Sequence, residues 1–130
     1  MKKKIYFLGI KNLNKYFDKK YEVIEITTKS LLNLREEGDV ILLVINLNEL
    51  NYSFEEREVI SKIPTLLIAD TLDESNLYLG YTLGVEEIID ERVGSFFIKK
   101  KVERIFERVE LLEKVKLMEK EVSRWGRKLI

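Results

Sequence analysis

The sequence predicts an α/β domain built around a parallel five-stranded sheet. Five short, nearly continuous apolar runs recur along the 130 residues, and amphipathic segments with helical spacing separate them. Such runs are typical of parallel strands buried on both faces, with helices as crossover connections. Five strands in a chain of this length suit a doubly wound, flavodoxin-like sheet with strand order 2-1-3-4-5. The hydrophobic content of 45% is enough for one compact core.

The apolar runs place the five strands near residues 4–8, 21–26, 40–45, 65–69 and 87–89. The third run, VILLVI, has the longest unbroken apolar stretch and is expected at the centre of the sheet. The second run alternates, with Tyr21 and Val23 on one face and Ile24 and Ile26 on the other. Alternation indicates a less buried strand, so we expect this one nearer an edge.

Helices are expected between the strands, over residues 12–20, 30–37, 50–63 and 75–83. Gly38 and Gly84 follow two of these segments, as glycines do after helix C-termini. Ser53 and Glu56 have the spacing of a capping box, and Pro64 ends the segment that contains them.

A long last helix is expected after Ser95, which is predicted to cap it. It carries two apolar stripes that are offset from each other near residue 111. The first stripe is Ile98, Val102, Ile105, Val109 and Leu112, and the second is Leu111, Val115, Met118, Val122, Trp125 and Leu129. The offset predicts that the first half packs on the sheet while the second half faces another partner. We therefore divide the chain into a globular domain, 1–110, and a helical extension, 111–130.

The second stripe has the spacing of a short coiled coil, flanked by charges such as Glu110, Lys114, Glu119 and Lys120. It predicts a parallel homodimer in which Val115, Met118, Val122 and Trp125 form the contact. The alternative is that the helix folds back on its own domain. That arrangement needs a turn, and the nearest glycine, Gly126, comes only at the end.

Composition excludes several classes of function. Lys plus Arg and Asp plus Glu both number 23, so the chain lacks the basic excess that is typical of nucleic-acid binding. Cys and His are absent, which argues against zinc and excludes Ser–His and Cys–His nucleophile pairs. We expect no cofactor, no membrane span and a cytoplasmic location. Glutamine is absent and Lys, Glu and Ile are abundant, a tendency of thermophile proteins that a low-GC genome would also produce.

Three segments resemble landmarks of the receiver domains of two-component response regulators, in the right order. DVILLVINLNEL (39–50) resembles the third strand and its turn, PTLLIAD (64–70) the fourth strand, and LGVEEII (83–89) the entry to the fifth strand. The resemblance covers residues 4 to about 110 and implies the receiver (CheY-like) fold. It also implies a signalling module that docks on an output domain or a partner protein.

The residues of receiver chemistry are replaced here, if the resemblance is followed position by position. The acidic pair falls at Gly9 and Ile10, the phosphoacceptor at Val44, the hydroxyl residue at Ala69, and the lysine and proline at Glu91 and Arg92. Phosphoryl transfer needs a nucleophile, a metal and a cation. The resemblance therefore implies a pseudo-receiver that is regulatory, independent of phosphorylation and not an enzyme.

A second hypothesis keeps the fold but assigns a small-ligand sensor. Ligands of open α/β sheets bind beyond the carboxyl ends of the strands, where Gly9, Asn46, Asn48 and Asp70 are expected to line a crevice. The alternative for these residues is that they satisfy the backbone of turns, as Asn and Gly commonly do. An enzyme of this fold is a third, weaker hypothesis, because no Gly-rich phosphate loop is present.

Overall fold

A computed structural model describes residues 3–10, 17, 21–34 and 40–129. Its sheet has five strands, all parallel, in the order β2-β1-β3-β4-β5, which confirms the predicted topology. The strands are β1 (Lys3–Leu8), β2 (Tyr21–Glu25), β3 (Val40–Asn46), β4 (Thr65–Ala69) and β5 (Glu87–Asp90).

Burial along the strands follows their positions in the sheet. All of β4 is buried, and successive side chains of the central strand β3 enter the two opposite cores of the domain. Leu42 and Val44 belong to one core, and Leu43 and Ile45 to the other. Strand β2 lies at one edge, and Tyr21 and Val23 pack into one core while Ile24 and Ile26 pack into the other, as the sequence predicts.

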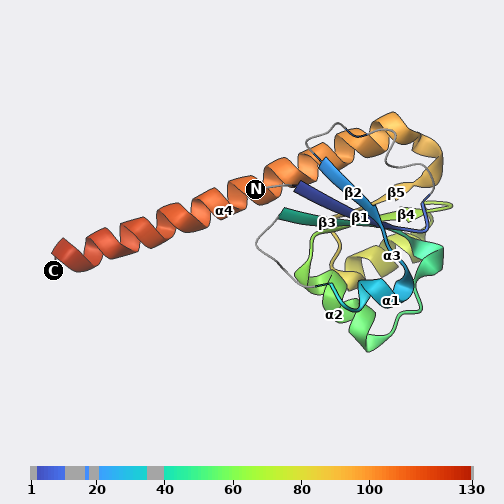
Figure 1. Ribbon diagram of the computed structural model, residues 1–130, viewed down its shortest axis with the longest axis horizontal. Coiled ribbons are helices and arrows are strands. Elements are labelled where there is room, and N and C mark those ends of the chain that lie inside the picture. The colour runs from blue at the N-terminus through green and yellow to red at the C-terminus, as the bar shows by residue number, and fades with distance from the viewer. Residues whose placement is uncertain (1–2, 11–16, 18–20, 35–39, 130) are drawn as a thin grey trace.

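Helices cover both faces of the sheet (Figure 1). One face is covered by α1 (Thr28–Leu31), α2 (Phe54–Lys62) and α3 (Glu74–Leu83), and the other by the first half of α4 (Ser95–Leu129). Two short 3-10 turns, η2 (Leu47–Glu49) and η3 (Glu91–Val93), follow β3 and β5.

The starts and ends of several helices differ from expectation. Helix α1 is capped by the side chain of Thr27 and ends at Leu31, so it is earlier and shorter than the helix expected over 30–37. The segment expected to begin at residue 50 starts at Phe54, because Ser53, in extended backbone, caps the helix. Helix α4 begins at Ser95 itself, preceded by Gly94, so Ser95 is not the cap. The helix expected over 12–20 and the stop at Gly38 lie outside the described residues, apart from Phe17.

The predicted capping box of α2 is confirmed. The backbone N–H of Glu56 donates to Ser53 Oγ at 3.2 Å, and Glu56 Oε1 accepts from the Ser53 N–H at 3.2 Å. The same carboxylate oxygen also accepts from the Asn51 N–H at 2.9 Å. These bonds satisfy one oxygen of the Glu56 carboxylate, a residue that is 2% exposed, while Oε2 has no hydrogen-bond partner in the part of the chain that the structure describes. Helix α3 ends at Gly84 in the left-handed conformation, also as predicted.

Helix α4 has two parts with different environments. Ile98, Val102 and Ile105 of the first stripe are buried against the sheet together with Phe106, which the stripe did not include. Ion pairs of 2.8 Å from Lys3 to Glu110 and 2.6 Å from Lys101 to Glu87 tie this half to β1 and β5.

The second half of α4 continues as one straight rod beyond the domain (Figure 1). Leu112, expected in the sheet-facing stripe, is 55% exposed, so the contact with the sheet ends at Val109. The helix runs without a turn to Leu129 and does not fold back. Among the described residues, no helix combines the length and the apolar character needed to cross a membrane.

Candidate functional site

The carboxyl ends of the strands bring the predicted crevice residues together. Gly9 follows β1, Asn46 ends β3 and Asp70 follows β4, while Asn48 lies in η2. Asn46 Nδ2 donates to the Gly9 carbonyl at 3.4 Å, and Asn48 Nδ2 donates to Asp70 Oδ2 at 2.9 Å. The four residues therefore form one hydrogen-bonded cluster, which we call the edge cluster.

The edge cluster joins neighbouring turns. Asn46 Oδ1 accepts from the Asn48 N–H at 3.0 Å, which caps η2. The Asn46 amide thus binds the start of η2 with its oxygen and the turn after β1 with its nitrogen. This is the turn-stabilising role that the sequence offered as the alternative to ligand binding.

The turn after β1 lies so close to the turn after β3 that only glycine fits at position 9. Its φ is +77°, and a Cβ atom added there would lie 2.3 Å from Glu49 Cγ and 3.0 Å from Asn46 Cβ. A side chain would therefore force apart the residues that surround the turn, in addition to straining the left-handed backbone.

The structure places Val44 inside the sheet and Asn46 at its edge. Val44 is fully buried, two residues before the end of β3, and pairs with Phe7 on β1 and Leu66 on β4. The resemblance places the phosphoacceptor at Val44, and the buried valine there offers no carboxylate. Asn46 is the first polar residue after the apolar run, and it ends β3.

Carboxylates dominate the electrostatics at the end of β5. The Arg92 guanidinium donates to both oxygens of Asp90, at 2.6 to 3.2 Å, and holds the pKa of that carboxyl at about 2. A hydrogen bond with Asp70 raises the pKa of Glu91, and the negative charges of Asp70 and Asp90 raise it further. The Arg92 guanidinium therefore binds Asp90, while the Glu91 carboxyl lies beside Asp70 at the carboxyl ends of the strands.

The acidic side chains that the structure describes are not grouped as the ligands of a metal ion would be. Within the part of the chain that the structure describes, no group of three or more Asp and Glu carboxylates is placed to hold a metal ion. The remaining positions named by the resemblance carry no donor: Ala69 is a buried methyl group at the end of β4, and Ile10 packs against the core on the α4 face.

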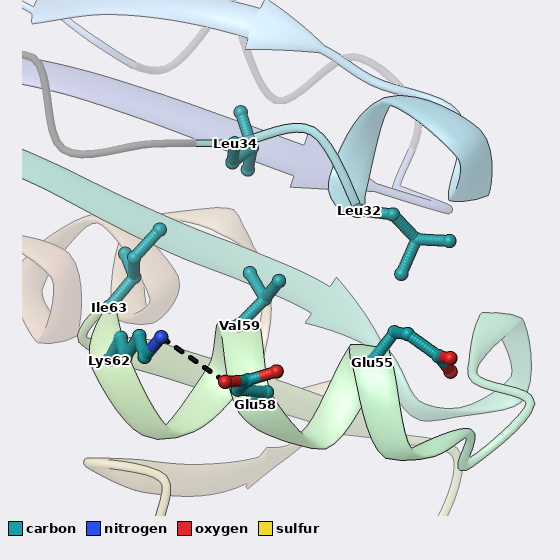
Figure 2. Close-up of a pocket in the computed structure, with 7 residues that line it drawn as sticks. All are labelled: Leu32, Leu34, Glu55, Glu58, Val59, Lys62 and Ile63. Atoms are coloured by element: carbon teal, nitrogen blue, oxygen red, sulfur yellow. Dashed lines mark hydrogen bonds and ion pairs between the residues drawn. The ribbon is translucent and has the colours of Figure 1, made fainter.

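A separate groove of about 550 Å³ lies between α2 and the segment after α1 (Figure 2). Val59 and Ile63 point from α2 toward the segment that carries Leu32 and Leu34. Glu58 and Lys62 form a 3.3 Å ion pair beside the groove. No residue of the edge cluster lines this groove, and its residues had no predicted function.

Comparison with solved structures identifies the fold. A signal receiver domain from Vibrio parahaemolyticus matches with a TM-score of 0.71 at 12% identity, over 88% of this chain and 98% of that one. The non-phosphorylated HemR receiver domain from Leptospira biflexa matches with a TM-score of 0.64 at 21% identity, over 80% and 94%. A response regulator receiver protein from Pseudoalteromonas atlantica matches with a TM-score of 0.64 at 14% identity, over 82% and 98%.

These similarities confirm the receiver (CheY-like) fold that the three sequence segments predicted. They are similarities of fold, at low sequence identity. In sequence, no family model and no curated protein matches the chain.

Proposed function

We propose that the chain is a receiver-like signal transduction module that works without phosphorylation and is not an enzyme. It dimerises through the second half of α4 and regulates an output domain or a partner protein. The fold supports the role of a signalling module. The observation that carries the independence from phosphorylation is Val44, a fully buried apolar side chain at the position where the resemblance places the phosphoacceptor.

Val44 occupies the position at which the resemblance places the receiver's phosphoacceptor aspartate. An acyl phosphate forms only on a carboxylate nucleophile, and neither the Val44 side chain nor the carboxamide of Asn46, which ends the same strand, supplies one. The amide is also committed to Gly9 and Asn48 through its two hydrogen bonds. Asn46 therefore links the turn after β1 to the turn after β3.

The surroundings of Asn46 oppose phosphate as well. Gly9 has no side chain to hold magnesium, and Ala69 has no hydroxyl to contact a phosphoryl group. Glu91 places a carboxyl beside Asp70, where the resemblance would require a lysine. The neighbouring carboxylates of Asp70 and Glu91 would repel a phosphate dianion, so this site disfavours phosphate binding.

The small-ligand alternative has less support at the same site. The polar side chains of Asn46, Asn48 and Asp70 bind one another and the neighbouring backbone. A ligand would have to replace these bonds, which costs free energy unless it makes equivalent ones.

Incubation with acetyl phosphate and magnesium, followed by intact-mass measurement, tests the proposal. We expect no phosphorylated species for the wild type or for Asn46→Asp, which places a carboxylate at the end of β3 without the metal ligands or the lysine. A receiver domain that accepts phosphate from acetyl phosphate is the positive control. A gain of one phosphoryl group by the wild type, lost in Asp70→Asn, would refute the proposal and identify Asp70 as the acceptor.

A further inference from the structure

The tail of α4, residues 111–129, carries an apolar face that its own domain does not cover. Its stripe residues are 42 to 71% exposed, and they are Leu111, Val115, Met118, Val122 and Trp125. A shallow apolar groove runs along Val115, Met118 and Val122. In Figure 1 this part of the helix projects away from the sheet and the other helices.

The exposed stripe points in a different direction from the sheet-facing stripe. Continuing the sheet-facing stripe by heptad spacing leads to Leu112, whereas the tail stripe begins at Leu111. A shift of one residue turns the face by about 100° around an α-helix. A partner can therefore cover the tail while Val102 and Phe106 stay buried in their own domain.

We infer that a second copy of this chain covers the tail as a parallel, in-register coiled coil that begins at Leu111. This inference rests on the proposed dimerisation and specifies its geometry. Val115 and Val122 occupy a positions of the heptad, and Leu111, Met118 and Trp125 occupy d positions.

The a and d positions form the seam of the coiled coil, and the seam begins at Leu111. The two preceding heptad positions on the same face are Arg104 and Arg108, which are exposed. Arg108 Nη1 lies 3.3 Å from Glu86 Oε2 of its own domain. Paired arginines in a seam repel each other, so the coiled coil does not extend into the globular domain.

Charges beside the seam select the parallel arrangement over a fully overlapped antiparallel one. In the parallel pair, Lys114 at a g position faces Glu119 at the following e position of the other copy. In the overlapped antiparallel pair, Glu119 would face Glu119 and Glu121 would face Glu121. These like charges disfavour that pair.

A staggered antiparallel pair is the strongest competitor. It would align Val115 with Met118 of the other copy and Lys114 with Glu121. It would also set Trp125 against Arg108 instead of against a second Trp125. The parallel pair buries one more apolar layer, because each stripe residue meets its own copy.

Single-cysteine crosslinking reads the arrangement directly, because the wild-type chain contains no cysteine. Under mild oxidation, we expect Val122→Cys to give a disulfide-linked dimer. The control Lys120→Cys, on the outer face of the same turn, should not. In the staggered antiparallel pair the two copies of position 122 would be roughly 16 Å apart, too far for a disulfide.

Charge variants provide the second arm, measured by sedimentation equilibrium. Glu119→Lys should weaken the dimer about tenfold, and the double variant Lys114→Glu, Glu119→Lys should recover it. Glu121→Lys should have little effect in the parallel pair but should weaken the staggered antiparallel one.

The outcomes separate the two proposals. A dimer that does not crosslink at position 122 and is weakened by Glu121→Lys would overturn the parallel arrangement while leaving dimerisation intact. A wild-type chain that remains monomeric at high micromolar concentration would overturn both this inference and the dimerisation in the proposed function. Neither outcome bears on phosphorylation, which the acetyl phosphate experiment tests separately.

Discussion

Replacing Phe106 by alanine tests whether the first half of α4 forms the core on its face of the sheet. The Phe106 side chain is 1% exposed. Its ring centroid lies 5.4 Å from that of Tyr21 on the edge strand β2, and Lys3 Nζ lies 5.9 Å from the ring centroid. Removing the ring therefore takes away contacts with two strands as well as with the helix's own neighbours.

The expected loss is large compared with the stability of a domain of this size. Truncating a buried phenylalanine to alanine costs about 3–5 kcal/mol, because apolar contacts are lost and a cavity remains. The whole free energy of unfolding of such a domain is about 5–15 kcal/mol. With about 4 °C per kcal/mol, the midpoint of thermal unfolding should fall by about 12–20 °C.

The matched control is Phe96→Ala, one of the first residues of the same helix. Phe96 is 71% exposed, and Lys100 Nζ lies 5.5 Å from its ring centroid. An exposed contact of this kind contributes at most about 1 kcal/mol. Both variants should be unfolded in urea at one protein concentration and followed by circular dichroism, because Trp125 lies in the tail and does not report on the core.

The difference in stability between the two variants tests whether the first half of α4 covers the sheet. A loss for Phe106→Ala no larger than that for Phe96→Ala would mean that α4 does not cover the sheet in solution. The assignment of the two halves of α4 to different partners would then fail as well.

Three further predictions concern the edge cluster and the tail. Gly9→Ala should lower the free energy of unfolding in urea by about 1–3 kcal/mol, and by more than the control Gly84→Ala. Both glycines have positive φ, but an added Cβ would meet Glu49 and Asn46 at Gly9, whereas no atom lies within 4 Å of it at Gly84. Glu91→Gln should raise the free energy of unfolding at pH 7. The hydrogen bond with Asp70 raises the pKa of Glu91 above its ordinary value of 4.5, so the folded state favours the protonated carboxyl and stability is lost as the pH rises through the raised pKa. The advantage of Gln should therefore vanish at pH values well below 4.5, where Glu91 is protonated in both states. Truncation after Leu111 should leave a folded monomer by light scattering and circular dichroism, whereas an unfolded product would show that the tail packs on its own domain.

The sequence by itself determined the sheet. Strands buried on both faces must be apolar at successive positions, so the five runs marked the strands, and the alternation that begins at Tyr21 marked an edge. The local signals of Ser53, Glu56 and Gly84 also predicted the structure correctly, because caps depend on backbone geometry within a few residues.

The meeting of Gly9, Asn46, Asn48 and Asp70 at one edge could also be predicted, because the carboxyl ends of parallel strands share an edge. The hydrogen bonds among them could not. They depend on the lengths and conformations of the loops and on which side chains face each other across them. The approach of Glu91 to Asp70 depends on the same geometry and was not foreseen.

Three features were decided by the tertiary structure alone. Strand β3 ends at Asn46, one residue beyond the expected 40–45, because its pairing with β4 continues to Asn46. Phe106 is a core residue because its ring packs against that of Tyr21 on the edge strand β2, a contact between segments far apart in sequence. Leu112 is exposed because α4 has passed the end of the sheet at that point. Periodicity predicts which side of a helix is apolar, but the extent of the sheet beneath the helix decides where that side is buried.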